Sequence, residues 1–111
     1  MTSPDNWHIV ENVFPQEMIN HKETVFTIGN GFLSTRGTFE EGYPGEVPTT
    51  FVHGVFNDVP TFGTELVNFP NPFSLSIQCD GEPVRMDEGK ILDYQRVLSL
   101  ESGLLTRRLV W

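Results

Sequence analysis

Cysteine, long apolar runs and a leader segment are largely missing from this chain. Cys79 is the only cysteine among 111 residues, which excludes an internal disulfide. It falls in an alternating apolar run, and this position predicts a buried, unreactive thiol. No apolar stretch approaches the ~20 residues that a bilayer-spanning helix requires, and the first residues lack the pattern of a signal peptide. We therefore expect a cytoplasmic protein.

Basic residues are also scarce. Lys and Arg number 7 against 15 Asp and Glu, which gives a net charge of −8. Such a charge repels the phosphates of nucleic acids and the headgroups of anionic lipids. We therefore expect neither a nucleic acid nor a membrane as a partner.

Helical periodicity is the third absence, because no long stretch repeats its apolar residues every 3.6 positions. The aromatic content of 12%, mostly Phe, favours sheet instead. The predicted fold class is all-β and mainly antiparallel. In the first part of the chain we predict a strand at 7–14, one helical turn at 16–22, a strand at 24–28 and a returning strand at 32–39.

Prolines and glycines dominate the middle of the chain, between residues 42 and 72. Only residues 49–56 keep a strand pattern there, and Gly54 weakens it. About thirty residues of loop are unusual within a compact domain. We therefore expect this region to lie over a surface supplied by something else.

Two hairpins are predicted in the last third. The first joins a strand at 73–79 to one at 84–86 through Asp80-Gly81, a signal for a type I′ turn. The second joins 91–100 to 104–111. Because the chain stops within that last strand, we expect residues 1–111 to form a β-domain that is incomplete at its C-terminal end.

Motifs for metal, nucleotide and nucleophilic chemistry are lacking. The three histidines are dispersed, no Gly-x-Ser-x-Gly elbow occurs, and we expect no metal site and no catalytic residue. The stretch 29–34 begins like a dinucleotide fingerprint, but a predicted strand follows it where a helix is required. Glu40 and Glu41 are adjacent, and neighbours on a strand face opposite ways. They therefore do not form the carboxylate pair that glycoside cleavage needs, unless the strand ends between them.

One segment is more informative than these, the turn Gly29-Asn30-Gly31 followed by Arg36-Gly37. Either Asn30 or Gly31 can adopt the positive φ of a tight turn. A guanidinium beside a sheet core usually pairs with a carboxylate, so Arg36 is predicted to form a structural ion pair with a glutamate. The alternative is contact with a sugar or a phosphate.

Aromatic residues in the loop region invite two interpretations. Flat rings suit the apolar faces of sugars, but such rings more often seal a domain interface, which we favour. The residues concerned are Tyr43, Phe51, Phe56, Phe62 and Phe69.

Six segments, taken in order, resemble the N-terminal domain of glycoside hydrolase family 65. The family contains the maltose, trehalose and kojibiose phosphorylases and their hydrolytic relatives. No single segment is specific, but the order of six covers nearly the whole chain. They are Glu23–Glu41, His53–Phe56, Glu65–Pro70, Phe73–Glu82, Ile91–Leu100 and Leu105–Arg108.

The resemblance implies an N-terminal β-sandwich of the galactose-mutarotase-like type, followed in such enzymes by a helical linker and an (α/α)₆ barrel. The glutamate acid and the phosphate-binding residues of the family lie in that barrel, and no residue of this chain matches them. Phosphorolytic members use inorganic phosphate on an α-glucosyl disaccharide with inversion, and hydrolytic members use water. No organic cofactor is implied, and a homodimer is expected by analogy.

A second hypothesis remains open, a stand-alone carbohydrate-binding or interaction module without catalysis. The β-rich pattern and the loop aromatics favour it. The disaccharide linkage, the choice between phosphate and water, and the oligomeric state have no signal in the sequence.

Overall fold

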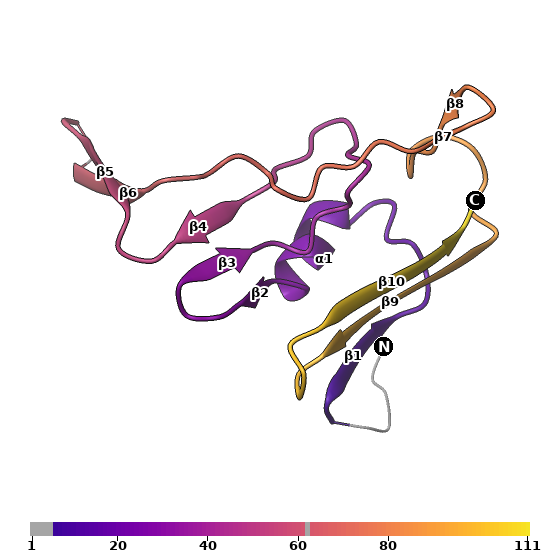
Figure 1. Cartoon of the computed structure of the whole chain (residues 1–111), viewed down its shortest axis with the longest axis horizontal. Helices are drawn as coiled ribbons and strands as arrows, with labels where there is room; N and C mark the ends of the chain where they lie inside the picture. The colour runs from indigo at the N-terminus through magenta and orange to yellow at the C-terminus, as the bar shows by residue number, and fades with distance from the viewer. Residues whose placement is uncertain (1–5, 62) are drawn as a thin grey trace.

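A computed structural model describes residues 6–61 and 63–111 of the chain. Within these residues the strands pair antiparallel throughout, in two three-stranded sheets and two hairpins (Figure 1). One short helix, α1, accompanies them in the described part. The predicted all-β, mainly antiparallel fold class is therefore confirmed.

The first sheet has the strand order β1-β9-β10. Its strands are β1 (His8–Glu11), β9 (Asp93–Ser99) and β10 (Leu105–Val110). Side chains alternate between the faces of a strand, and Tyr94, Arg96 and Leu98 on β9 are all buried on one face. The predicted hairpin that joins β9 to β10 is confirmed, with Gly103 at φ 70° in its turn.

The second sheet follows the predicted glycine turn. Its strands are β2 (Ile28–Gly29), β3 (Leu33–Thr35) and β4 (Thr50–Val52), in the order β2-β3-β4. Gly31 takes the positive φ of the turn, 87°. The side-chain oxygen Oδ1 of Asn30 accepts hydrogen bonds from the amides of Phe32 at 3.0 Å and Leu33 at 2.9 Å. Asparagine thus holds the turn through its side chain, in the manner typical of this residue.

The predicted strand at 24–28 is wrong, because its first residues belong to helix α1 (Ile19–Val25). The predicted helical turn at 16–22 also lies too early. Ile19, Glu23 and Phe26 recur at helical spacing, and Glu23 and Phe26 are buried whereas Val25 is exposed. Burial of this face overrides the strand preference of the β-branched residues Thr24 and Val25.

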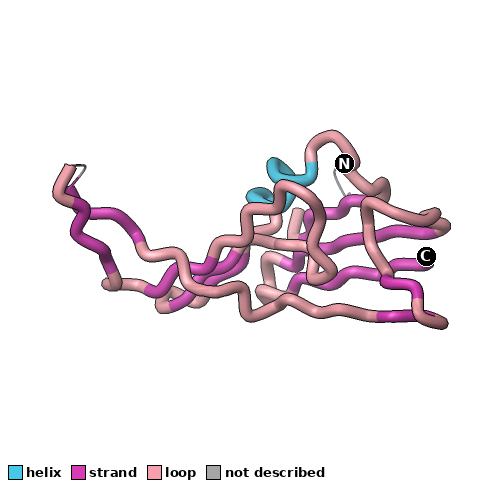
Figure 2. The backbone as a smooth tube through the Cα atoms, turned by 90° about the horizontal axis from the view of Figure 1, so that it is seen from above, coloured by secondary structure: helices cyan, strands magenta, loops and turns pink. Residues whose placement is uncertain are grey.

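The middle of the chain holds more strand than predicted. The expected strand at 49–56 divides at Gly54, whose φ of 78° turns the chain between β4 and β5. Strands β5 (Phe56–Val59) and β6 (Gly63–Leu66) then pair as a hairpin. Figure 2 shows this hairpin projecting from the rest of the molecule.

The other hairpin is shorter than predicted. Asp80 and Gly81 adopt positive φ angles of 51° and 83°, as the type I′ signal requires. However, the strands are only β7 (Gln78–Cys79) and β8 (Glu82–Pro83). Cys79 is exposed, so the prediction of a buried thiol is wrong. Phe73, Leu75 and Ile77 are exposed as well, because no described element covers this alternating segment.

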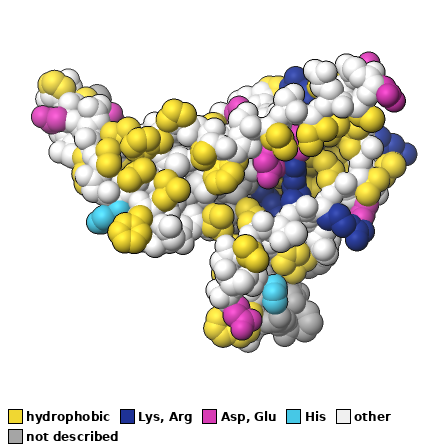
Figure 3. Space-filling view, viewed as in Figure 1, with side chains coloured by type: hydrophobic (Ala, Val, Ile, Leu, Met, Phe, Trp, Pro, Cys, Tyr) yellow, Lys and Arg dark blue, Asp and Glu magenta, His cyan; other side chains and the backbone are white. Residues whose placement is uncertain are grey.

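The core is small and lies between the first sheet and the chain that leaves β3. It is formed by Phe39, Met86 and Tyr94, with Phe14, Ile19, Tyr43, Ile91 and Leu109 packed around them. The radius of gyration is 16.0 Å, against ~13 Å for a compact domain of similar length. Many large apolar side chains consequently lie on the surface (Figure 3).

Candidate functional site

Arg36, the predicted site residue, contacts two residues of helix α1. Its Nη2 atom lies 3.7 Å from Oε2 of Glu23 and also donates to the carbonyl oxygen of Asn20. The other carboxylate oxygen of Glu23 accepts a hydrogen bond from the amide of Phe39 at 3.3 Å. Glu23 therefore ties the helix to the segment that follows Arg36.

Glu23 is completely buried. Burial raises the pKa of its carboxyl, while the Phe39 amide, the Tyr43 hydroxyl, Arg36 and Arg96 act in the opposite direction. Burial and the neighbouring Glu23 also raise the pKa of Tyr43. A carboxyl without solvent exposure has no access to a disaccharide, so its place here is structural.

Gly37 is required by close packing and not by an unusual φ. A Cβ atom at this position would lie 2.6 Å from Cβ of Phe26 and 2.7 Å from its carbonyl oxygen. The Gly37 amide donates to the carbonyl of Glu23 at 3.0 Å. The chain after β3 thus runs directly against the end of the helix, where a side chain has no room.

Arg96 on β9 completes this arrangement, and only 2% of it is exposed. Its guanidinium carbon lies 4.1 Å from the ring centre of Phe26 and 4.7 Å from that of Phe39. Nη1 donates to the Gly37 carbonyl at 2.8 Å, and Nη2 lies 3.0 Å from Oε1 of Glu11. The cation is therefore held between two aromatic faces and paired with a buried carboxylate.

The Glu11 carboxylate also accepts a hydrogen bond from the hydroxyl of Tyr94 at 2.5 Å. Burial and this hydrogen bond raise the pKa of the Tyr94 phenol. Sequence reasoning did not single out Arg96. The signal for it was the alternation along β9, which places an arginine between two apolar residues, Tyr94 and Leu98, on one face.

Glu40 and Glu41 converge on one cation, because they lie between β3 and β4 and not on a continuous strand, the exception that the prediction allowed. The chain turns at this point, and the Gly42 amide donates to the Phe39 carbonyl at 3.0 Å. Nη2 of Arg107 lies 2.9 Å from Oε2 of Glu40 and 2.5 Å from Oε1 of Glu41. Because one guanidinium binds both carboxylates, they do not form an acid and base pair for glycoside cleavage.

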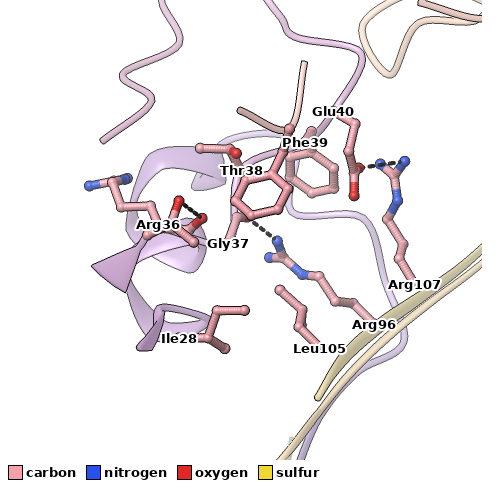
Figure 4. A pocket seen from close by; sticks show the side chains of 11 residues that line it. Ile28, Arg36, Gly37, Thr38, Phe39, Glu40, Arg96, Leu105 and Arg107 are labelled. Carbon is pink, nitrogen blue, oxygen red and sulfur yellow. Dashed lines mark hydrogen bonds and ion pairs between the residues drawn. The ribbon is translucent and has the colours of Figure 1, made fainter. Parts of the chain in front are cut away.

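A pocket of about 130 Å³ lies beside these groups. Ligand pockets typically measure ~300–1,000 Å³, so a disaccharide does not fit here. The three arginines around it already contact carboxylates. The main lining residues are Ile28, Arg36, Phe39, Arg96, Leu105 and Arg107 (Figure 4).

The loop aromatics are scattered. Tyr43 packs edge-on against Phe39 with ring centres 6.5 Å apart, whereas 56% of Phe56 is exposed on β5. Phe51 lies in β4, and the Phe69 amide donates to Thr50 at 2.9 Å. Phe62 lies outside the described residues. Of the four described aromatics, Phe51 and Phe56 line one groove, whereas Tyr43 packs elsewhere, against Phe39.

The described residues offer neither a metal-binding cluster nor a membrane-spanning helix. They contain no group of three or more His, Cys, Asp or Glu side chains placed to hold a metal ion. None of their helices is long and apolar enough to cross a membrane.

The fold and these contacts define an all-β domain in which Arg96 and Arg107 of the first sheet bind the segment that follows β3. Residues 9–111 match the family model described as "Glycosyl hydrolase family 65, N-terminal domain". The chain belongs to this family and corresponds to that domain.

Similar proteins agree with this assignment. A kojibiose phosphorylase of Caldanaerobacter subterraneus is 38% identical over 94% of this chain and 14% of its own length. An α,α-trehalose phosphorylase of Thermoanaerobacter brockii is 31% identical over 96% of this chain and 16% of its own length. A solved structure from the human microbiome, provisionally named a kojibiose phosphorylase, gives a TM-score of 0.86 at 28% identity, covering 98% of this chain and 16% of that one. The chain therefore spans only a small part of the length of these relatives.

Proposed function

We propose that this chain is the N-terminal domain of an enzyme that transfers a glucosyl group from an α-glucosyl disaccharide to inorganic phosphate. The observation that carries the proposal is the 38% identity to a kojibiose phosphorylase over 94% of the chain. Kojibiose is accordingly the first candidate substrate. Trehalose and maltose follow, because an α,α-trehalose phosphorylase is 31% identical and a maltose phosphorylase 28% identical to this chain.

The reaction forms one bond and breaks one. A phosphate oxygen attacks the anomeric carbon of the glucosyl unit while its glycosidic C–O bond breaks. A carboxylic acid gives its proton to the departing sugar oxygen. Attack from the opposite face inverts the anomeric centre and yields β-glucose 1-phosphate. We assign the acid and the phosphate site to an (α/α)₆ barrel outside residues 1–111, and the reaction needs no organic cofactor.

In this proposal the role of residues 1–111 is structural. Glu11, Glu23 and the Glu40-Glu41 pair are the carboxylates nearest the predicted site, and each is paired with Arg96, Arg36 or Arg107. A carboxylate held in this way is poorly suited to giving or taking a proton during a reaction. We therefore propose that residues 1–111 alone are inactive.

The test is to express the complete gene and to incubate the enzyme with phosphate and each of kojibiose, trehalose and maltose. We expect glucose 1-phosphate from at least one of them, and none from residues 1–111 alone. Release of free glucose without glucose 1-phosphate would show that the enzyme hydrolyses the disaccharide and does not phosphorolyse it. We further propose a cytoplasmic homodimer, which fractionation and light scattering test.

A stand-alone carbohydrate-binding module is the second candidate. The exposed rings of Phe32 and Phe56 favour it, at 75% and 56% exposure. Calorimetric titration of residues 1–111 with the same three disaccharides separates the two proposals. Only a carbohydrate-binding module should show a heat of binding that saturates as disaccharide is added.

A further inference from the structure

The β5–β6 hairpin, here called the arm (residues 56–59 and 63–66), is supported by little besides its own pairing. Its strands bond to each other over four residue pairs, from Phe56 with Leu66 to Val59 with Gly63. One side-chain hydrogen bond crosses between them, from Asn57 to Glu65 at 3.3 Å. A two-stranded hairpin is marginally stable in water, so an arm that projects from the body gains order by packing on a further surface (Figure 2).

An apolar groove lies at the base of the arm. It has a volume of about 210 Å³ and is lined mainly by Phe32, Leu33, Phe51, Val52, Phe56 and Leu66. Phe32 is 75% exposed, Phe56 56% and Leu66 51%. These side chains come from the β2–β3 turn and from both strands of the arm, so one surface gathers three separate segments. Such clustered exposure is typical of an interaction site.

The charged side chains of the arm have one sign. No lysine or arginine occurs between Arg36 and Arg85, although acidic residues are frequent there. Asp58 and Glu65 lie on the arm itself, and both are exposed. The groove therefore complements an apolar side chain that is flanked by positive charge.

A sugar and a second copy of this chain fit less well. The only lining residues of the groove with a polar side chain are Ser34 and His53, whereas a sugar site requires several converging hydrogen-bond partners. Two copies that met arm to arm would bring Asp58 and Glu65 of one chain toward the same acids of the other, which is unfavourable.

We propose that the arm and its groove dock onto a basic surface with an apolar anchor residue, supplied by the part of the parent enzyme outside residues 1–111. This rests on the proposed function, since the kojibiose phosphorylase of Caldanaerobacter subterraneus has most of its length beyond the matching domain. The arm then acts as a clamp between this domain and the remainder of the enzyme.

Hydrogen exchange on the enzyme encoded by the complete gene tests the docking. In the Asp58→Lys/Glu65→Lys variant we expect the amides of β5 and β6 to exchange at least ~10-fold faster than in the wild type, because docking protects them. The matched control Glu101→Lys changes an exposed acid at the β9–β10 turn and should leave the arm unchanged. Equal exchange of the arm in wild type and double variant would overturn the proposal.

A photo-crosslinking amino acid at position 56 identifies the occupant in the same enzyme. Adducts with a lysine- or arginine-bearing peptide from outside residues 1–111 support the proposal. Adducts with residues 1–111 of a second copy, the absence of adducts, or protection of the arm only after kojibiose is added would each overturn it. Phosphorolysis by the wild-type enzyme is measured separately. Failure of the docking proposal therefore does not decide the proposed function, and failure of the proposed function does not decide the docking.

Discussion

Arg96 donates a hydrogen bond from Nη1 to the carbonyl oxygen of Gly37 at 2.8 Å, across 59 positions of sequence. The arginine belongs to the central strand of the first sheet, and the glycine follows β3 of the second sheet. Gly37 packs directly against Phe26, and any larger residue at this position would clash with it. The bond therefore joins the two sheets at the end of helix α1, where the apolar core is small.

Replacement of Arg96 should destabilise the fold strongly. In Arg96→Met, Glu11 keeps its place but loses its cation, and breaking a buried pair in this way costs ~3–5 kcal/mol. Arg96→Lys should also be costly, because lysine lacks the flat guanidinium that stacks between Phe26 and Phe39. Urea unfolding followed by circular dichroism measures both. Arg108→Lys, at a mostly exposed arginine of β10, is the control and should have little effect.

Gly37→Ala should cost more than Gly31→Ala, although only Gly31 has a positive φ. The new methyl at position 37 would overlap Phe26 at 2.6 Å, and overpacking of this kind costs ~1–3 kcal/mol or more. At position 31 no atom lies within 4 Å, so only backbone strain of ~1 kcal/mol is expected. Thermal unfolding of the two variants gives the order, and the reverse order would contradict the packing role of Gly37.

Local signals in the sequence predicted part of this fold well. The turns at Gly31 and Asp80-Gly81 and the β9–β10 hairpin depend on residues close in sequence, and the structure has them. The helical turn predicted at 16–22 was placed too early, because tertiary burial of Glu23 and Phe26 extends the helix to residue 25. The strand preference of Thr24 and Val25 pointed the other way.

The contacts between distant segments could not be predicted from such local signals. Arg36 was expected beside a glutamate, yet nothing in the spacing selects Glu23, 13 positions earlier and on a helix. Arg107 meets Glu41 across 66 positions, and only the turn after Phe39 brings the carboxylates of Glu40 and Glu41 to one side. The alternation of side chains along a strand does not predict where the chain turns.

Stability should depend on pH through Glu23. Burial raises the pKa of this carboxyl above its usual 4.5, so the folded state holds the proton to higher pH than the unfolded state. The stabilisation from this group is complete below pH ~4.5 and is lost as the pH rises through the folded pKa. Relative to wild type, Glu23→Gln should therefore gain stability from pH 4 upward. Urea unfolding at several pH values tests this, and a relative stability that falls with rising pH would contradict it.

Arg107 should be coupled to Glu41 in stability. Arg107→Gln leaves two neighbouring carboxylates without their cation and should cost ~2 kcal/mol or more. Adding Glu41→Gln should recover part of this loss, with a coupling of ~1–3 kcal/mol in a double-mutant cycle. Additive effects of the two substitutions would show that the close contact at 2.5 Å contributes little.

We expect the Arg36–Glu23 pair to take no part in catalysis, and this can be tested in the enzyme encoded by the complete gene. Arg36→Gln removes the cation opposite Glu23 and should lower the unfolding midpoint, because the Glu23 carboxyl is fully buried. The KM for phosphate and for disaccharide should stay within about twofold of wild type, since this residue touches no substrate in our account. A KM for phosphate raised tenfold or more would instead place Arg36 in the binding site.

The most direct measurement is the product that the enzyme encoded by the complete gene forms from kojibiose and inorganic phosphate, followed by phosphorus and proton NMR. Our account predicts β-glucose 1-phosphate and glucose in equal amounts. It also predicts that residues 1–111 alone form neither, because their carboxylates near Arg36, Arg96 and Arg107 are occupied by ion pairs. Absence of any sugar phosphate with kojibiose, trehalose and maltose, or turnover by residues 1–111 alone, would contradict it.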